Sequence, residues 1–371
     1  MKMSKFIKST LILLVGGFLT KVLGMLIKII TTRIIGTETL GLYMLIMPTF
    51  NLFITLAQGG LPISVSKIVS ENKKDNKKIV FSSIFISICT TFFLMILLIF
   101  ISPLIAKFLH NDSLSFPIMC IGLTLPFISL SGIIRGYFFG KENMFPHVFS
   151  NNFEQVVRIV LNIIFLPLLS NYEPRVSVTF LILSNVISET TSIIILYFFL
   201  PRKIKVTKEM LKPEKIIIKD VLNISIPTTG SRIIGTIGYF LEPIVLTSFL
   251  LMNGYTTNYI TYEYGVLTGY VMPLLLLPSF FTMAISQATL PVISNGYANN
   301  KIPYVKKKIK QSLLLSFAIG LFFTIILMIF PEIFMKLIYN TNEGVSYIRK
   351  LAPFFLLLYI QTPLVSVMQA L

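Results

Sequence analysis

The sequence has few charged residues for its length. Only 13% of its 371 residues are Asp, Glu, Lys or Arg, whereas soluble domains carry about 25%. Hydrophobic residues make up 54% of the chain, and the mean hydropathy is +0.83. The charged residues lie mostly in short runs between long apolar stretches. This layout excludes a water-soluble globular protein and indicates an all-α polytopic membrane protein.

Acidic residues are scarcer than basic ones. The 15 Asp and Glu face 32 Lys and Arg, which gives a formal net charge of +17. A nucleic-acid-binding protein would gather its basic side chains on a folded polar surface, and this chain has almost none. We therefore expect no nucleic-acid partner, and membrane topology accounts for most of the charge.

The residues from which metal and catalytic sites are usually built are also scarce. Cys89 and Cys120 lie in apolar stretches without a CxxC pattern, and His110 and His147 are isolated. This predicts no metal site, no disulfide framework and no cofactor. The segment 136–142 is too short for a phosphate-binding loop, and no catalytic triad or carboxylate pair is apparent. We predict that the protein is not an enzyme and that ATP does not power it.

Ten apolar segments are long enough to cross a bilayer of about 30 Å. They lie near residues 10–34, 40–65, 79–106, 117–139, 148–170, 176–200, 224–250, 265–292, 312–330 and 351–371. On this assignment, the loops and terminus on one side of the membrane hold 21 lysines and arginines and those on the other side hold six. Because cytoplasmic loops carry the excess of Lys and Arg, this predicts a multi-pass protein of the cytoplasmic membrane with a cytoplasmic N-terminus.

The chain also contains an internal repeat. Lys21 and Gly24 in the first span match Arg232 and Gly235 in the seventh, and both pairs have the spacing of one helical face. The longest polar stretch, residues 201–222, follows the sixth span. We therefore predict an N-terminal six-helix bundle over residues 1–200, a basic cytoplasmic linker over 201–222, and a second bundle over 223–371. The second bundle has four spans, which is what a truncated chain would give.

Several short motifs, spread along the chain, resemble those of a known transporter family. They are Lys21–Gly24, Thr32–Gly36, Leu61–Ser64, Arg135–Tyr137 and Leu290–Ser294. With these residues the chain resembles the stage V sporulation protein B branch of the multidrug/oligosaccharidyl-lipid/polysaccharide (MOP) exporter superfamily. It is also similar to MurJ-like lipid II flippases.

The resemblance implies a MATE-like transporter fold with two bundles that alternate between inward- and outward-facing states. It implies that an undecaprenyl-pyrophosphate-linked glycan, such as lipid II or a related peptidoglycan or polysaccharide precursor, moves from the cytoplasmic to the outer leaflet. The expected partners are this lipid-linked glycan, membrane lipids and proteins of cell-wall synthesis. The expected biological contexts are peptidoglycan biosynthesis and sporulation.

Ionisable residues inside a membrane are costly and mark functional sites or buried pairs. Five are basic and three are acidic, namely Lys21, Lys28, Arg135, Arg158, Arg232, Glu154, Glu189 and Glu242. The surplus of cations predicts a cavity for a pyrophosphate. Lys21, Lys28 and Arg232 are the candidate substrate ligands, with Arg135 as a headgroup anchor. The alternative for both lysines is snorkelling towards the interface.

The acidic residues fall into two groups. Glu154 and Arg158 have the spacing of a helical ion pair and predict a structural role, with Glu189 as an alternative counter-ion of Arg158. Glu242 precedes Pro243, whose ring frees a backbone carbonyl one turn earlier. This combination predicts a coupling site for Na+ or H+, and pairing of Glu242 with Lys28 is the alternative.

Two other functions fit parts of the sequence. A multidrug or cation antiporter of the same superfamily would need an acidic cavity, which the surplus of cations argues against. A membrane enzyme acting on polyprenyl phosphates would need clustered carboxylates to hold magnesium, and the sequence shows none.

Overall fold

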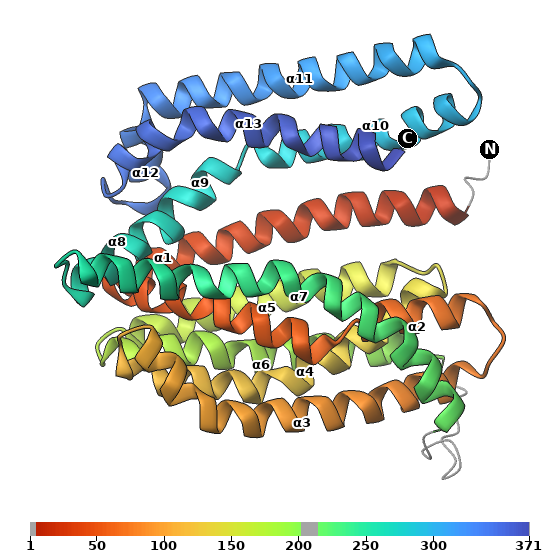
Figure 1. Cartoon of the computed structure of the whole chain (residues 1–371), viewed down its shortest axis with the longest axis horizontal. Coiled ribbons are helices and arrows are strands. Elements are labelled where there is room, and N and C mark those ends of the chain that lie inside the picture. Colours follow the sequence, from red (N-terminus) through yellow and green to blue (C-terminus); the bar gives the residue numbers. More distant parts are fainter. Residues whose placement is uncertain (1–4, 202–213, 371) are drawn as a thin grey trace. The chain divides into compact units, whose positions relative to one another are not determined.

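The structure, a computed structural model, describes residues 5–201 and 214–370 (Figure 1). Most of the predicted linker at 201–222 therefore lies outside the described residues. Within them every regular element is a helix: α1 (Lys5–Gln58), α2 (Leu61–Ser70), α3 (Asn76–Phe108), η1 (Asp112–Leu114), α4 (Ser115–Gly140), α5 (Phe145–Leu169), α6 (Pro174–Phe199), α7 (Lys215–Met252), α8 (Thr257–Gly265), η2 (Val266–Val271), α9 (Met272–Leu276), α10 (Ser279–Ala298), α11 (Ile302–Ile329), α12 (Pro331–Tyr339) and α13 (Val345–Ala370). The predicted all-α polytopic fold is confirmed.

Eight of the described helical runs are long and apolar enough to cross a membrane, or nine if the bent run 257–298 is one span. The first of them, Val15–Ser70, has 56 residues, far more than the roughly 20 that one crossing needs. It is broken at Gly36, whose backbone (φ 72°, ψ 169°) is not helical. Figure 1 shows the chain reversing direction within α1. Counting this run as two crossings gives the ten spans expected from the sequence.

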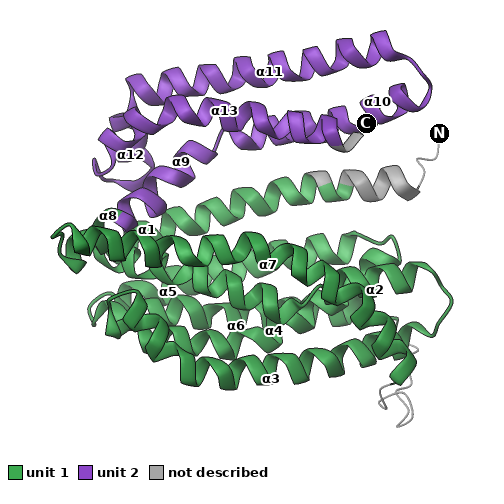
Figure 2. Ribbon diagram, viewed as in Figure 1, with its two compact units in different colours: residues 1–263 green, residues 264–371 purple. Residues whose placement is uncertain are grey.

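The described chain forms two compact units, residues 1–263 and 264–371 (Figure 2). Unit 1 contains α1 to α7 and most of α8, and unit 2 contains the helices from η2 onward. Helix α7 packs against α1, α2 and α3 within unit 1. The predicted bundle boundary at 201–222 concerns the sequence repeat, which this packing does not test, and it stays a prediction.

Unit 1 is held together partly by a row of glycines on α4. A Cβ atom added to Gly136 would lie 2.4 Å from the carbonyl oxygen of Pro62 in α2, and one on Gly140 would lie 2.6 Å from that of Ser66. Glycine at this spacing lets two membrane helices approach closely, where packing rather than the hydrophobic effect drives association. The Arg135–Tyr137 motif noted in the sequence therefore includes a residue needed for helix packing.

The first half of α1 packs along α5. Gly16 lies against Val148, the Thr20 hydroxyl donates to Oδ1 of Asn152 over 2.8 Å, and Asn162 donates to the Thr31 hydroxyl over 2.9 Å. These contacts fix which face of α1 meets α5. Lys21 directly follows Thr20, so it lies about 100° around the helix from the Thr20 contact.

Unit 2 is built mainly from α10, α11 and α13, which pack against one another. The buried Tyr359 of α13 fits against Gly320 of α11, and its hydroxyl donates to the carbonyl oxygen of Leu275 over 2.5 Å. A long aromatic side chain opposite a glycine thus joins the helices of this unit.

Candidate substrate-binding site and intramembrane charges

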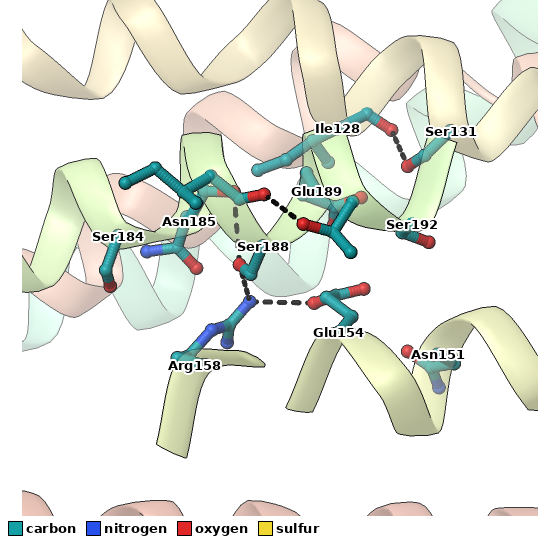
Figure 3. Close-up of polar contacts among 12 residues, drawn as sticks. Ile128, Ser131, Asn151, Glu154, Arg158, Ser184, Asn185, Ser188, Glu189 and Ser192 are labelled. Atoms are coloured by element: carbon teal, nitrogen blue, oxygen red, sulfur yellow. Dashed lines mark hydrogen bonds and ion pairs between the residues drawn. The ribbon is translucent and has the colours of Figure 1, made fainter. Parts of the chain in front are cut away.

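Four of the predicted intramembrane charges form one cluster inside unit 1. Arg135 of α4 lies 2.8 Å from Glu154 of α5 and 3.5 Å from Glu189 of α6, and Arg158 of α5 lies 2.7 Å from Glu154. Glu154 thus bridges both arginines. Figure 3 shows Glu154, Arg158 and Glu189 gathered between α5 and α6. The cluster connects three helices through charged side chains alone.

The cluster is well buried and internally neutral. The Glu154 and Glu189 side chains are 5% and 8% exposed, and those of Arg135 and Arg158 are 16% and 22% exposed. The cluster contains two cations and two anions, so its formal charges cancel. Buried charges are tolerated only when they are paired and further hydrogen-bonded, so this arrangement meets the first requirement.

Serines of α6 supply part of the further hydrogen bonding, while Nε of both arginines and Oε2 of Glu189 are buried without a hydrogen-bond partner among the described residues. Nη2 of Arg135 donates to the Ser192 hydroxyl over 2.8 Å, and Nη2 of Arg158 donates to that of Ser188 over 3.3 Å. Ser192 follows Glu189 by three residues and Ser188 by four, so the three side chains lie on neighbouring parts of one face of α6. The spacing is visible in the sequence, but which arginine each serine meets is not.

Arg135 therefore has partners within the protein. Its guanidinium group contacts Glu154, Glu189 and Ser192 in the described structure. The role of Arg135 as a lipid-headgroup anchor stays a prediction, to be weighed against these three contacts. Glu189 pairs with Arg135, whereas Arg158 pairs with Glu154.

The remaining predicted ligands lie outside the cluster. Lys21 of α1 and Arg232 of α7 are exposed, and within the described residues neither forms an ion pair. Lys28 is half-buried and Glu242 is exposed. The four clustered charges neutralise one another. The predicted intramembrane charges outside the cluster are three cations and one anion.

Open space surrounds the helix faces that carry Lys21 and Arg232. A Cβ atom added to Gly17 or Gly24 of α1, or to Gly235 of α7, would meet no atom within 4 Å. The glycines of α4, by contrast, are in close contact with α2. Helices α1 and α7 thus each present an exposed basic residue beside glycines that no other part of the described chain contacts.

The face of α7 that carries Arg232 is continuous with a tight helix contact. A Cβ atom on Gly60, just before α2, would lie 2.9 Å from the carbonyl oxygen of Ser225, and the hydroxyls of Ser64 and Ser225 are 2.9 Å apart. Arg232 is seven residues, or two helical turns, beyond Ser225 on the same stripe. The stripe is therefore packed near the start of α7 and open further along.

Two ion pairs that sequence reasoning missed hold the start of α7 to the start of α3 and the loop before it. Lys74 pairs with Asp220, and Lys78 lies 3.6 Å from Glu214. In the sequence these lysines indicate only membrane topology. Their partners are more than 130 residues away, so no local pattern marks the pairs.

The part of the chain that the structure describes holds no metal-binding cluster. Among the described residues, no three His, Cys, Asp or Glu side chains gather as metal ligands would. Glu242 is followed by Pro243 inside α7, as the sequence indicates.

Comparison with known proteins identifies the family. Residues 6–296 match the family described as polysaccharide biosynthesis protein, and residues 243–371 match the MatE family. Stage V sporulation protein B of Bacillus subtilis (strain 168) is 38% identical over 381 residues, which covers 99% of this chain and 73% of the relative. The chain belongs to the polysaccharide biosynthesis protein family. Eight or nine apolar helical runs among the described residues make it a multi-span membrane protein.

More distant relatives agree with this placement. Sporulation protein YkvU of B. subtilis (strain 168) is 27% identical, covering 95% of this chain and 80% of the relative. Lipid II flippase MurJ of the same organism is 22% identical, and the match covers 84% of this chain and 61% of the relative. An inward-facing multidrug resistance MATE family transporter of the MOP superfamily superposes with a TM-score of 0.72 at 16% identity, covering 94% of this chain and 83% of that structure. The predicted MATE-like fold is confirmed.

Proposed function

We propose that this protein is a secondary transporter of the cytoplasmic membrane, with its N-terminus in the cytoplasm, and not an enzyme. Its proposed substrate is an undecaprenyl-pyrophosphate-linked glycan, lipid II or a related cell-wall or polysaccharide precursor, which it moves to the outer leaflet. The family assignment supports transport of such a lipid, and the similarity to lipid II flippase MurJ supports the pyrophosphate carrier.

The observation that carries the proposal is the charge left after the buried cluster is accounted for. Lys21 and Arg232 lie on matching helices beside glycines with open space around them. Arginine binds phosphate oxygens through two parallel hydrogen bonds, and lysine acts as a point charge. Such a pair suits a pyrophosphate, which carries negative charge on two adjacent groups. Lys28 lies on the same helical face as Lys21 and adds a third cation.

The coupling ion is proposed to bind near Glu242. Because Pro243 has no N–H and its ring obstructs the preceding turn, a carbonyl one turn earlier lacks its usual donor. A carboxylate beside such a carbonyl offers oxygen ligands for Na+ or a site for a proton. The ion gradient or the membrane potential would then drive the exchange between inward- and outward-facing states.

The test is lipid II translocation by the full-length protein in reconstituted vesicles. We expect Lys21→Ala and Arg232→Ala each to slow translocation at least roughly tenfold, as loss of a charged phosphate contact removes more than about 1.4 kcal/mol. Lys107→Ala is the matched control, because Lys107 is an exposed basic residue at the end of α3. Undiminished translocation in both site variants would exclude the proposed pyrophosphate site.

The antiporter alternative is tested in the same vesicles. A cationic dye replaces the lipid, and its gradient-driven uptake is compared with and without the protein. We expect no uptake, because the charges left outside the buried cluster are mainly positive and repel a cation. Efficient dye uptake combined with absent lipid translocation would favour the antiporter.

A further inference from the structure

Unit 2 contains a cavity that the proposed transport site does not use. It has a volume of about 780 Å³ and lies where α10 ends and α11 begins. Its lining residues are Val292, Asn295, Gly296, Lys301, Pro303 and Tyr304. Three of them offer polar groups, an amide, an ammonium and a phenol, and the others are apolar or small. The cavity can therefore accept a polar group and an adjoining hydrocarbon segment.

The charge around this cavity has one sign. Five lysines occupy ten residues at this end of α11, namely Lys301, Lys306, Lys307, Lys308 and Lys310, and the sequence has no Asp or Glu between Glu263 and Glu332. Four of the five are exposed. Lys308 lies over the Tyr304 ring, with its Nζ 5.6 Å from the ring centroid. The excess of Lys and Arg in cytoplasmic loops explains why lysines occur here. It does not explain why one of them lines a cavity.

Large apolar and aromatic side chains lie exposed beside the same cavity. Tyr297, Ile302 and Tyr304 are 46%, 39% and 45% exposed. Tyrosine at such a position is typical of the membrane–water interface, where one end of the ring meets lipid and the other meets water. The apolar part of the α11 span follows directly after the lysines. The cavity therefore lies at the level of lipid headgroups.

We propose that this cavity binds the headgroup of an anionic phospholipid from the leaflet at the α10–α11 end, which the charge distribution predicts to be the cytoplasmic one. Lys301 contacts the phosphate, Asn295 and the Tyr304 hydroxyl contact the glycerol or headgroup oxygens, and the acyl chains leave along Ile302. Basic pockets at the cytoplasmic ends of membrane helices bind anionic lipids by this chemistry. The proposal does not depend on the transported substrate.

The test measures binding of short-chain phosphatidylglycerol to the purified full-length protein, read as the rise in melting temperature during titration. Each lysine near an anionic headgroup contributes enough to expect about fivefold weaker binding in Lys301→Gln. Asn295→Leu removes the amide from the cavity lining without changing charge and is expected to weaken binding similarly. Lys336→Gln, an equal charge change in α12, is the matched control and is expected to bind as the wild type does.

Three results would overturn the proposal. In the first, Lys301→Gln and Lys306→Gln weaken binding equally while Asn295→Leu has no effect, which indicates diffuse attraction to the lysines. In the second, inorganic phosphate raises the melting temperature as much as phosphatidylglycerol does at the same concentration, which indicates a free-phosphate site. In the third, phosphatidylcholine raises the melting temperature as much as phosphatidylglycerol does at the same concentration. Because each variant is first compared without lipid, a loss of folding is distinguished from a loss of binding.

Discussion

At the scale of single residues, Glu154 determines how the intramembrane charges divide. It contacts both Arg135 and Arg158, and it is 5% exposed. Without Glu154 the two arginines would share Glu189 alone, and a positive charge would be left buried. The cluster therefore has two consequences: it connects α4, α5 and α6, and it does not include Lys21 of α1 or Arg232 of α7.

This role predicts a large effect of removing one carboxylate. Glu154→Gln keeps the shape of the side chain but leaves buried arginines incompletely paired, which we expect to destabilise the protein by about 3 kcal/mol. Glu332→Gln breaks the pair with Arg349, whose side chains are about half exposed, and is expected to cost less than about 1 kcal/mol. The measurement is the melting temperature of each variant in detergent. Equal losses for the two variants would show that the cluster does not stabilise unit 1.

At the scale of helices, α7 is fastened at its start and open further along. Ser225 touches Ser64, Asp220 pairs with Lys74, and the amide of Glu214 donates to the Ser82 hydroxyl over 3.3 Å. Two turns beyond Ser225, Arg232 is exposed. The proposed alternation between inward- and outward-facing states requires this fastened end to separate from α2 and α3 when the path opens on that side.

A reversible cross-link tests this requirement. In a background with Cys89→Ala and Cys120→Ala, we expect Ser64→Cys with Ser225→Cys to form a disulfide, since the two hydroxyl oxygens are 2.9 Å apart. Oxidation is expected to stop lipid translocation in vesicles, and a reductant is expected to restore it.

The Ser64→Cys single variant controls for oxidation at other sites. Translocation that continues with the disulfide fully formed would show that α2 and α7 need not separate. Absence of the disulfide under oxidising conditions would contradict the close approach of these two helices.

How much of this could be read from the sequence differs from element to element. The apolar runs predict the helices, and Gly36 stands where the first run divides, because glycine readily adopts positive φ. The spacing of Glu154 and Arg158 predicts their contact, because both lie on one helix. The contacts of Arg135 depend on how α4, α5 and α6 are oriented about their axes relative to one another. The periodicity within one helix does not predict this orientation. The pairing of Lys74 with Asp220 is hidden for the same reason.

At the scale of the whole molecule, the proposed substrate and ion sites share helix α7. Arg232 and Glu242 are ten residues apart, about 15 Å along a helix. The side chain of Glu242 is exposed, and Pro243 weakens the hydrogen bonding of the turn beside it. Binding of a cation there can therefore alter the bend of α7 and, with it, the position of Arg232. A ligand shifts such an equilibrium only by binding the two states differently.

This arrangement predicts that substrate movement and its energy source can be separated by one substitution. Glu242→Gln removes the charge that attracts Na+ or accepts a proton but leaves Lys21 and Arg232 in place. We expect the variant to exchange lipid II between leaflets at close to the wild-type rate without a gradient, and to lose the acceleration that a Na+ or H+ gradient gives the wild type. Glu332→Gln, outside the proposed site, should keep that acceleration. A Glu242→Gln variant that still responds fully to both gradients would place the coupling ion elsewhere. Loss of exchange even without a gradient would instead assign Glu242 to the lipid path, because a residue needed only for coupling has no effect on downhill movement.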